Sequence, residues 1–181
     1  MTHEVVMAGF GGQGMLLVGQ LLAYAGMLED KQVSWIPSYG PEMRGGTANC
    51  SVIISNEPIG APIVSEPTSV VVMNLPSLDK FESLLKPGGV LIINSSLISI
   101  DARRSDVTVY KVPANDIANE LGNAKVANMV VLGALIAATN VVATKTAVKA
   151  FQKKFAGKPK MFAINEEAIR RGFAYVKDSV K

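Results

Sequence analysis

Cysteine and histidine are almost absent from this sequence, which has Cys50 and His3 as the single residue of each type among 181. One cysteine cannot form an internal disulfide, and no Cys/His cluster exists to hold zinc or an iron–sulfur cluster. No histidine is placed beside a serine or cysteine nucleophile, and no carboxylate pair has a readable spacing. We therefore expect no metal centre and no catalytic residue in this chain alone.

Long apolar runs and basic stripes are lacking too. The most apolar segment, Val126 to Thr139, has about 14 residues, whereas a membrane span needs about 20. The first residues lack the basic start and apolar core of a signal peptide, so a cytoplasmic location and no membrane contact are expected. Lysines are scattered, apart from a short cluster of Lys153-Lys154 and Lys158-Lys160. No basic stripe is interleaved with aromatic residues, so a net charge of +3 gives no specific support for nucleic-acid binding.

Apolar residues, in contrast, are abundant. They make up 49% of the chain, and charged residues only 18%. A chain of this length fits one domain, residues 1–181, with a real core. Its apolar composition predicts surface that faces a partner, so the isolated chain is expected to pair with itself as a homodimer.

Strands and helices alternate along the first two thirds of the sequence. Apolar β-type runs separated by helix-compatible stretches predict two β-α-β units, with Ser77 as the N-cap of the second helix. The last third has helical patterns, the final one capped by Asn165. Expected strands cover Glu4–Gly9, Gln32–Ile36, Thr47–Ser55, Ser69–Leu75, Gly89–Asn94 and Val107–Val112; expected helices cover Met15–Met27, Ser77–Leu85, Asp116–Leu121, Ala127–Thr139, Thr146–Phe155 and Glu166–Val176.

This alternation indicates an α/β fold of three layers. We expect a Rossmann-like, mostly parallel sheet with helices on both faces. The segment from Pro37 to Pro67, rich in proline and glycine, holds one β-like stretch and predicts an inserted strand or hairpin after the second strand.

A glycine-rich motif follows the first expected strand. Gly9, Gly11, Gly12 and Gly14, with Gln13 among them, fit GxGxxG and open a helix, an arrangement that suits a phosphate at backbone N–H groups. Three alternatives stand beside an anion site. Glycines can merely permit close packing of helix on strand. NAD binding is disfavoured because the second strand ends without an acidic residue. A methyltransferase, to which Leu85–Ile92 has some likeness, lacks the same acid.

The second motif runs from Ser38 to Cys50. Ligands of open α/β sheets gather beyond the carboxyl ends of strands, so this loop and the glycine loop are expected to share one face. Arg44 can contact a carboxylate or phosphate through two hydrogen bonds, or simply pair with Glu42. Cys50 is expected to be a buried, inert thiol. Surface and packing roles are expected for His3, in the terminal tail, and Trp35, in a strand.

Together GFGGQG and SYGPEMRGGTANCSVIIS resemble the gamma subunit, or gamma-type domain, of the 2-oxoacid:ferredoxin oxidoreductases, and the likeness extends to Asn128-Met129 and Gly133. The resemblance implies alpha, beta and ferredoxin-like delta subunits that hold thiamine diphosphate, magnesium and iron–sulfur clusters. It also implies oxidative decarboxylation of a 2-oxoacid to acyl-CoA with reduction of ferredoxin. The sequence of the second motif resembles the 2-oxoglutarate branch of the family, or the branched-chain one, more than the pyruvate branch.

Resemblance and physics together favour a role in binding coenzyme A. Backbone donors of the glycine loop would meet a phosphate, with side-chain contacts from Gln13 and Arg44. The second loop would complete a shared active site against a partner subunit, through Ser38, Tyr39, Glu42, Gly45, Gly46, Thr47 and Asn49. A free-standing nucleotide-binding enzyme and a non-catalytic binding module are the competing interpretations.

Overall fold

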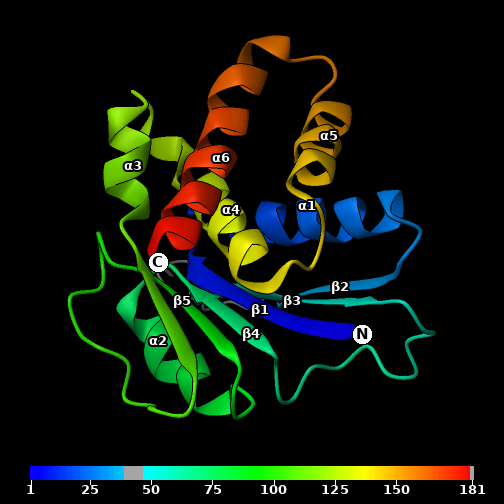
Figure 1. Cartoon of the computed structure of the whole chain (residues 1–181), viewed down its shortest axis with the longest axis vertical. Coiled ribbons are helices and arrows are strands. Elements are labelled where there is room, and N and C mark those ends of the chain that lie inside the picture. Colours follow the sequence, from blue (N-terminus) through cyan, green and yellow to red (C-terminus); the bar gives the residue numbers. More distant parts are fainter. Residues whose placement is uncertain (39–46, 180–181) are drawn as a thin grey trace.

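A computed structural model, which describes residues 1–38 and 47–179, has one six-stranded sheet with helices on both faces (Figure 1). The strands lie in the order β2-β3-β1-β4-β5-β6. Their bounds are β1 Thr2–Phe10, β2 Gln32–Ser38, β3 Thr47–Ser55, β4 Ser69–Val72, β5 Val90–Asn94 and β6 Thr108–Val112. The α/β fold with a mostly parallel sheet is thus confirmed.

The strand expected as an insertion takes a place inside the sheet. β3 lies between β1 and β2 and runs antiparallel to both, while β1, β4, β5 and β6 are parallel. β3 is buried along most of its length, and β4 is buried at every residue. Such continuous burial explains why the central strands are apolar without alternation.

Helices cover the two faces unequally. On one face lie α1 (Met15–Leu28), α3 (Ala114–Glu120), α4 (Ala127–Thr139), α5 (Thr144–Lys154) and α6 (Phe162–Ser179), and Figure 1 shows α2 (Leu75–Phe81) on the other face. The described residues also form short 3₁₀ turns: η2 Glu82–Leu84, η3 Ala124–Val126 and η4 Pro159–Met161. The larger core cluster joins α1, α3, α4, α5 and α6 to the sheet, and the smaller one joins α2 to β1, β4 and β5.

Helix α4 is the buried helix that its apolar composition predicts. Its residues 127–137 are all buried, between the sheet and α6. Two glycines allow the close crossing of α4 and α6: a Cβ at Gly133 would lie 2.0 Å from the Ile169 carbonyl oxygen, and one at Gly172 would lie 1.9 Å from that of Val130. Among the described residues, no helix combines the length and the apolarity that crossing a membrane requires.

Three local predictions are wrong. Helix α2 is capped by Asn74, whose Oδ1 accepts the Ser77 N–H at 2.9 Å, because Pro76 is tolerated within the first helical turn. Asn165 lies inside α6, where its Nδ2 donates to the Met161 carbonyl. His3 is half-buried in β1, opposite Ile54, and is not in a surface tail.

Candidate functional site

The glycine loop lies at the sheet edge where the parallel strands end. β1 ends at Phe10, β4 at Val72 and β5 at Asn94, with β1 and β4 as direct neighbours. The chain leaves β1 for α1 on one face and, after β4, enters α2 on the other (Figure 1). Such a reversal opens a crevice at the strand ends, where ligands of open α/β sheets bind.

Backbone geometry explains the glycines of this loop. Gly12 and Gly14 have φ of 94° and 78°. In this left-handed conformation a residue with a side chain would be strained. A Cβ on Gly14 would also lie 2.4 Å from Nδ2 of Asn128, on α4. The loop therefore packs directly against the start of α4 at Gly14, whereas a Cβ on Gly12 would meet nothing within 4 Å.

Gln13 holds the loop to the sheet. Its Oε1 accepts the Phe10 N–H at 2.6 Å, and its Nε2 donates to the Met73 carbonyl at 3.4 Å. Gly9 makes room for this amide, since a Cβ there would lie 2.6 Å from Oε1. The side chain is thus engaged within the loop, and a contact with a ligand stays a prediction.

A cavity of about 330 Å³ lies between the N-termini of α1 and α4. Neither helix has an acidic residue in its first turn, and no side chain caps α1. Helix α4 continues directly from η3, whose N-cap Asn123 accepts the Lys125 N–H. A helix N-terminus carries a partial positive charge, so two of them at one cavity favour an anion. The cavity is lined by Gly12, Gln13, Met73, Asn115, Ala124, Lys125, Ala127 and Asn128.

One lining amide has a fixed orientation. Oδ1 of the buried Asn94 accepts the Ala114 N–H at 3.2 Å, so its Nδ2 faces Asn115 and donates to Oδ1 there at 2.8 Å. The oxygen of Asn115 is therefore occupied, and its Nδ2 remains as a donor. The end of β5 thereby orients a hydrogen-bond donor of the cavity.

The lining contains a cation and no carboxylate. Lys125 is exposed and makes no ion pair with any of residues 1–38 or 47–179. Amide donors, a lysine and two helix N-termini together can hold a phosphate or diphosphate. Sequence reasoning missed Asn115 and Lys125 as site residues, because no local motif marks them, and noted Asn128 only as part of a resemblance.

The structure describes only the two ends of the second motif, Ser38 and the residues from Thr47 onward. Thr47 pairs with Phe10 across β3 and β1, and Asn49 pairs with both Ala8 and Ser38. Ser38, Thr47 and Asn49 therefore lie at the edge that carries the glycine loop. Tyr39, Glu42, Arg44, Gly45 and Gly46 lie outside the described residues, so the expected meeting of Arg44 with the glycine loop stays a prediction.

This arrangement does not suit the NAD alternative. A dinucleotide site needs an acidic residue at the end of a parallel strand beside β1. One neighbour of β1 is the antiparallel β3, and the parallel neighbour, β4, is followed by Met73 and Asn74.

Cys50 is fully buried in β3, and its Sγ faces the Met15 carbonyl. Burial raises the pKa of this thiol to about 12, although hydrogen bonds with Trp35 and Gly19 act the other way. The predicted burial of Cys50 is thus confirmed. A neutral thiol is a poor nucleophile, and the inertness of Cys50 stays a prediction. Among the described residues no group of three histidine, cysteine, aspartate or glutamate side chains could hold a metal ion.

A family model described as pyruvate ferredoxin/flavodoxin oxidoreductase matches residues 4–175. Among curated proteins, ketoisovalerate oxidoreductase subunit VorA of Methanothermobacter thermautotrophicus is 38% identical over 98% of this chain and 37% of its own. 2-Oxoglutarate synthase subunit KorC of Methanocaldococcus jannaschii is 42% identical over 83% of this chain and 82% of its own. The chain thus spans little more than a third of VorA and most of KorC.

Two solved structures share the fold. The gamma subunit of keto/oxoacid ferredoxin oxidoreductase from Geobacter sulfurreducens has a TM-score of 0.85 and 30% identity, over 97% of this chain and 99% of its own. The 2-oxoglutarate:ferredoxin oxidoreductase from Magnetococcus marinus, with 2-oxoglutarate, coenzyme A and succinyl-CoA bound, has a TM-score of 0.90 and 25% identity, over 98% of this chain and 31% of its own.

Proposed function

Because the chain belongs to the pyruvate ferredoxin/flavodoxin oxidoreductase family, as a gamma-type domain of the 2-oxoacid:ferredoxin oxidoreductases, we propose that it acts inside a multi-subunit enzyme by binding coenzyme A. The enzyme would decarboxylate a 2-oxoacid, transfer the acyl group to coenzyme A and reduce ferredoxin. Thiamine diphosphate, magnesium and iron–sulfur clusters would sit in partner subunits.

The cavity between α1 and α4 is the observation that carries this proposal. Coenzyme A is a polyanion, and the cavity offers two helix N-termini, Lys125 and amide donors, with no carboxylate in its lining. The homologue from Magnetococcus marinus was solved with coenzyme A bound. The glycine loop would supply backbone donors to a phosphate, and Arg44 would add a guanidinium.

The same edge of the sheet is proposed to face a partner subunit. Three large apolar side chains there are solvent-exposed in the isolated chain: Phe10 at the end of β1 (43%), Leu75 after β4 (40%) and Leu97 after β5 (51%). Exposed apolar side chains grouped at one edge are typical of interaction surfaces. The proposed partners are the alpha, beta and ferredoxin-like delta subunits, and Tyr39 and Glu42 would take part in that contact.

The proposed substrate is 2-oxoglutarate. KorC supports this choice with 42% identity and comparable length, whereas VorA, at 38%, supports a branched-chain 2-oxoacid. Ketoisovalerate is therefore the second candidate. The lining of the cavity in this chain suits the anionic acyl carrier and says nothing of the 2-oxoacid, whose pocket is proposed to lie mainly in the partner subunits.

Purification of the tagged chain from its source tests the proposal. Subunits with thiamine diphosphate and iron–sulfur clusters should copurify with it, and the purified complex should reduce ferredoxin with 2-oxoglutarate only when coenzyme A is present. If the complex preferred ketoisovalerate, the proposed substrate would change, but the proposed role of this chain in binding coenzyme A would stand. A chain purified without companions, or activity of the chain alone, would contradict it.

Arg44→Ala tests the proposed contribution of the second loop. We expect the complex to assemble normally and to need more coenzyme A for half-maximal turnover. Unchanged assembly together with unchanged dependence on coenzyme A would remove Arg44 from the site.

A further inference from the structure

Helix α5 and the turn after it form a surface of one charge sign. Residues 121–165 contain seven lysines and no arginine, aspartate or glutamate, a net charge of +7. The whole chain has 18 basic and 15 acidic residues, so the remainder has 11 basic and 15 acidic residues, a net charge of −4. One of the seven, Lys125, lines the cavity. We call the other six the lysine patch: Lys145, Lys149, Lys153, Lys154, Lys158 and Lys160.

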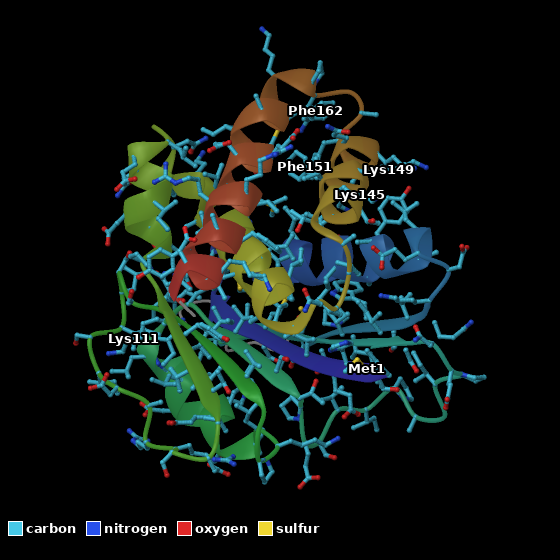
Figure 2. All side chains as sticks on the ribbon, viewed as in Figure 1. Met1, Lys111, Lys145, Lys149, Phe151 and Phe162 are labelled. Atoms are coloured by element: carbon cyan, nitrogen blue, oxygen red, sulfur yellow. The ribbon has the colours of Figure 1, made fainter. Side chains whose placement is uncertain are left out.

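All six side chains of the lysine patch are exposed, and none is in an ion pair with a described residue. The inner face of α5 is apolar, with Ala147, Ala150 and Phe151 buried. Phe151 packs edge-on against Phe162 of α6, with ring centroids 6.3 Å apart. Figure 2 shows both rings between α5 and α6, while Lys149 extends from the other side of α5. The core thus fixes which face of α5 carries the charge.

Three of these lysines form a row. Lys145, Lys149 and Lys153 are four residues apart, so they follow one side of the helix over about 12 Å. Like charges at this spacing destabilise a helix, and Lys145 lies in the first turn, where a cation opposes the helix dipole. The folded chain does not relieve this repulsion.

Two carboxylates close to Lys145 are engaged elsewhere. Glu29, at the end of α1, accepts the Ala143 N–H at 2.7 Å and pairs with Lys31 at 2.9 Å. Glu166, at the start of α6, pairs with Arg170 at 2.7 Å. The row therefore has no internal partner among the described residues, and its charge is available to an external one.

We infer that the lysine patch docks an acidic protein surface in a transient, salt-sensitive contact. A hollow of about 350 Å³, lined by Leu28, Lys145, Thr146 and Lys149, can take a carboxylate-bearing side chain between two ammonium groups. Lysine is strongly hydrated and is depleted from the buried cores of protein interfaces. A patch built from lysine alone therefore fits a contact that is steered by charge and stays hydrated, and not a permanent, buried one.

Nucleic acid and lipid are less suitable occupants. The patch contains no arginine for bidentate phosphate contacts, and the aromatic rings of α5 and its neighbours are packed inward, where they cannot stack on bases or insert into a bilayer. The inference is independent of the coenzyme A cavity.

Binding of fluorescent poly-L-glutamate to the full chain tests this inference. The variant K145E/K149E reverses two charges of the row, and the control K80E/K177E reverses two exposed lysines outside the patch that contact Phe81 and Phe173. Each pair of substitutions lowers the formal net charge from +3 by four, to −1. We expect the patch variant to bind poly-L-glutamate about tenfold more weakly and the control within about threefold of wild type.

Equal losses in the two variants would mean that only bulk charge matters and would overturn the inference. Tighter binding of the wild-type chain to duplex DNA or to anionic vesicles than to poly-L-glutamate would also overturn it, in favour of those partners. Circular dichroism should give both variants wild-type spectra, because the four side chains are exposed. Should K145E/K149E not fold, K145Q/K149Q against K80Q/K177Q gives the same comparison without charge reversal.

Discussion

Hydrogen bonds to neighbouring residues decide which polar groups of the cavity side chains remain free to bind a ligand. Asn94 occupies the oxygen of Asn115, and Gln13 is tied to the backbone of Phe10 and Met73. The side-chain oxygens of Asn115 and Gln13 therefore accept hydrogen bonds from the protein itself, while the Asn115 Nδ2 and Lys125 remain as donors at the surface of the cavity. At this scale the site is specified by hydrogen-bond orientation as much as by residue type.

Cys50 is expected to resist alkylation in the folded chain. Burial keeps its pKa at about 12, so the reactive thiolate is scarce at neutral pH. Iodoacetamide at pH 8 should label the native chain more than about a hundredfold more slowly than the chain in denaturant. Comparable rates in the two states would show that this thiol is accessible and ionised.

The crossing of α4 and α6 depends on glycine. Gly172→Ala would place a methyl group 1.9 Å from the Val130 carbonyl oxygen, and the helices would have to separate. Overpacking against backbone costs about 3 kcal/mol, which exceeds the gain of about 1 kcal/mol in helix propensity. We expect the free energy of unfolding, measured in urea, to fall by about 2 kcal/mol.

Gly157→Ala is the matched control for this substitution. A Cβ at Gly157 meets nothing within 4 Å, so the free energy of unfolding should stay within about 0.5 kcal/mol of wild type. Equal effects of the two substitutions would contradict the close crossing.

Glu29, the C-cap of α1, links this helix to α5 through hydrogen bonds. Burial alone would raise its pKa, but hydrogen bonds from the Ala143 N–H, Lys31 and Thr146 outweigh this and lower the pKa from 4.5. A carboxylate with a lowered folded pKa stabilises the fold above its unfolded pKa, and this contribution is lost as the pH falls through the folded value. Glu29→Gln should cost about 1 kcal/mol at pH 7 in a urea titration, and the difference should shrink below pH 4.5. A difference that persists at pH 3 would refute this role.

The sequence predicted the elements better than their ends. Apolar runs located all six strands and the span of α4, because burial on both faces demands continuous apolar residues. The cap of α2 was misplaced, since a proline beside serine is compatible with either Asn74 or Ser77 as the cap. The place of β3 between β1 and β2 depends on pairing between distant segments, which local pattern does not encode.

The cavity itself was only half predictable. The glycine motif located one wall, because a left-handed turn before a helix has a recognisable sequence. The other wall comes from Lys125 and Asn128, more than a hundred residues later, and only folding brings them to Gly14. Proximity of that kind leaves no signal in a single sequence.

At the scale of the whole molecule, the chain corresponds to one part of longer relatives. The match covers 37% of the length of VorA and 31% of the length of the matched chain from Magnetococcus marinus, so a similar domain occurs inside longer polypeptides. Phe10, Leu75 and Leu97 are exposed at the edge that holds the cavity. A cavity at such an edge would be completed by a neighbouring domain, which agrees with the proposed function.

The dependence of turnover on coenzyme A in a Lys125→Ala complex tests the central claim most directly. Loss of one charge-assisted contact should raise the KM for coenzyme A about tenfold, leave the KM for the 2-oxoacid unchanged, and spare the control Lys177→Ala. If the KM for coenzyme A stays at the wild-type value in the Lys125→Ala complex, the cavity between α1 and α4 is not where this chain meets coenzyme A.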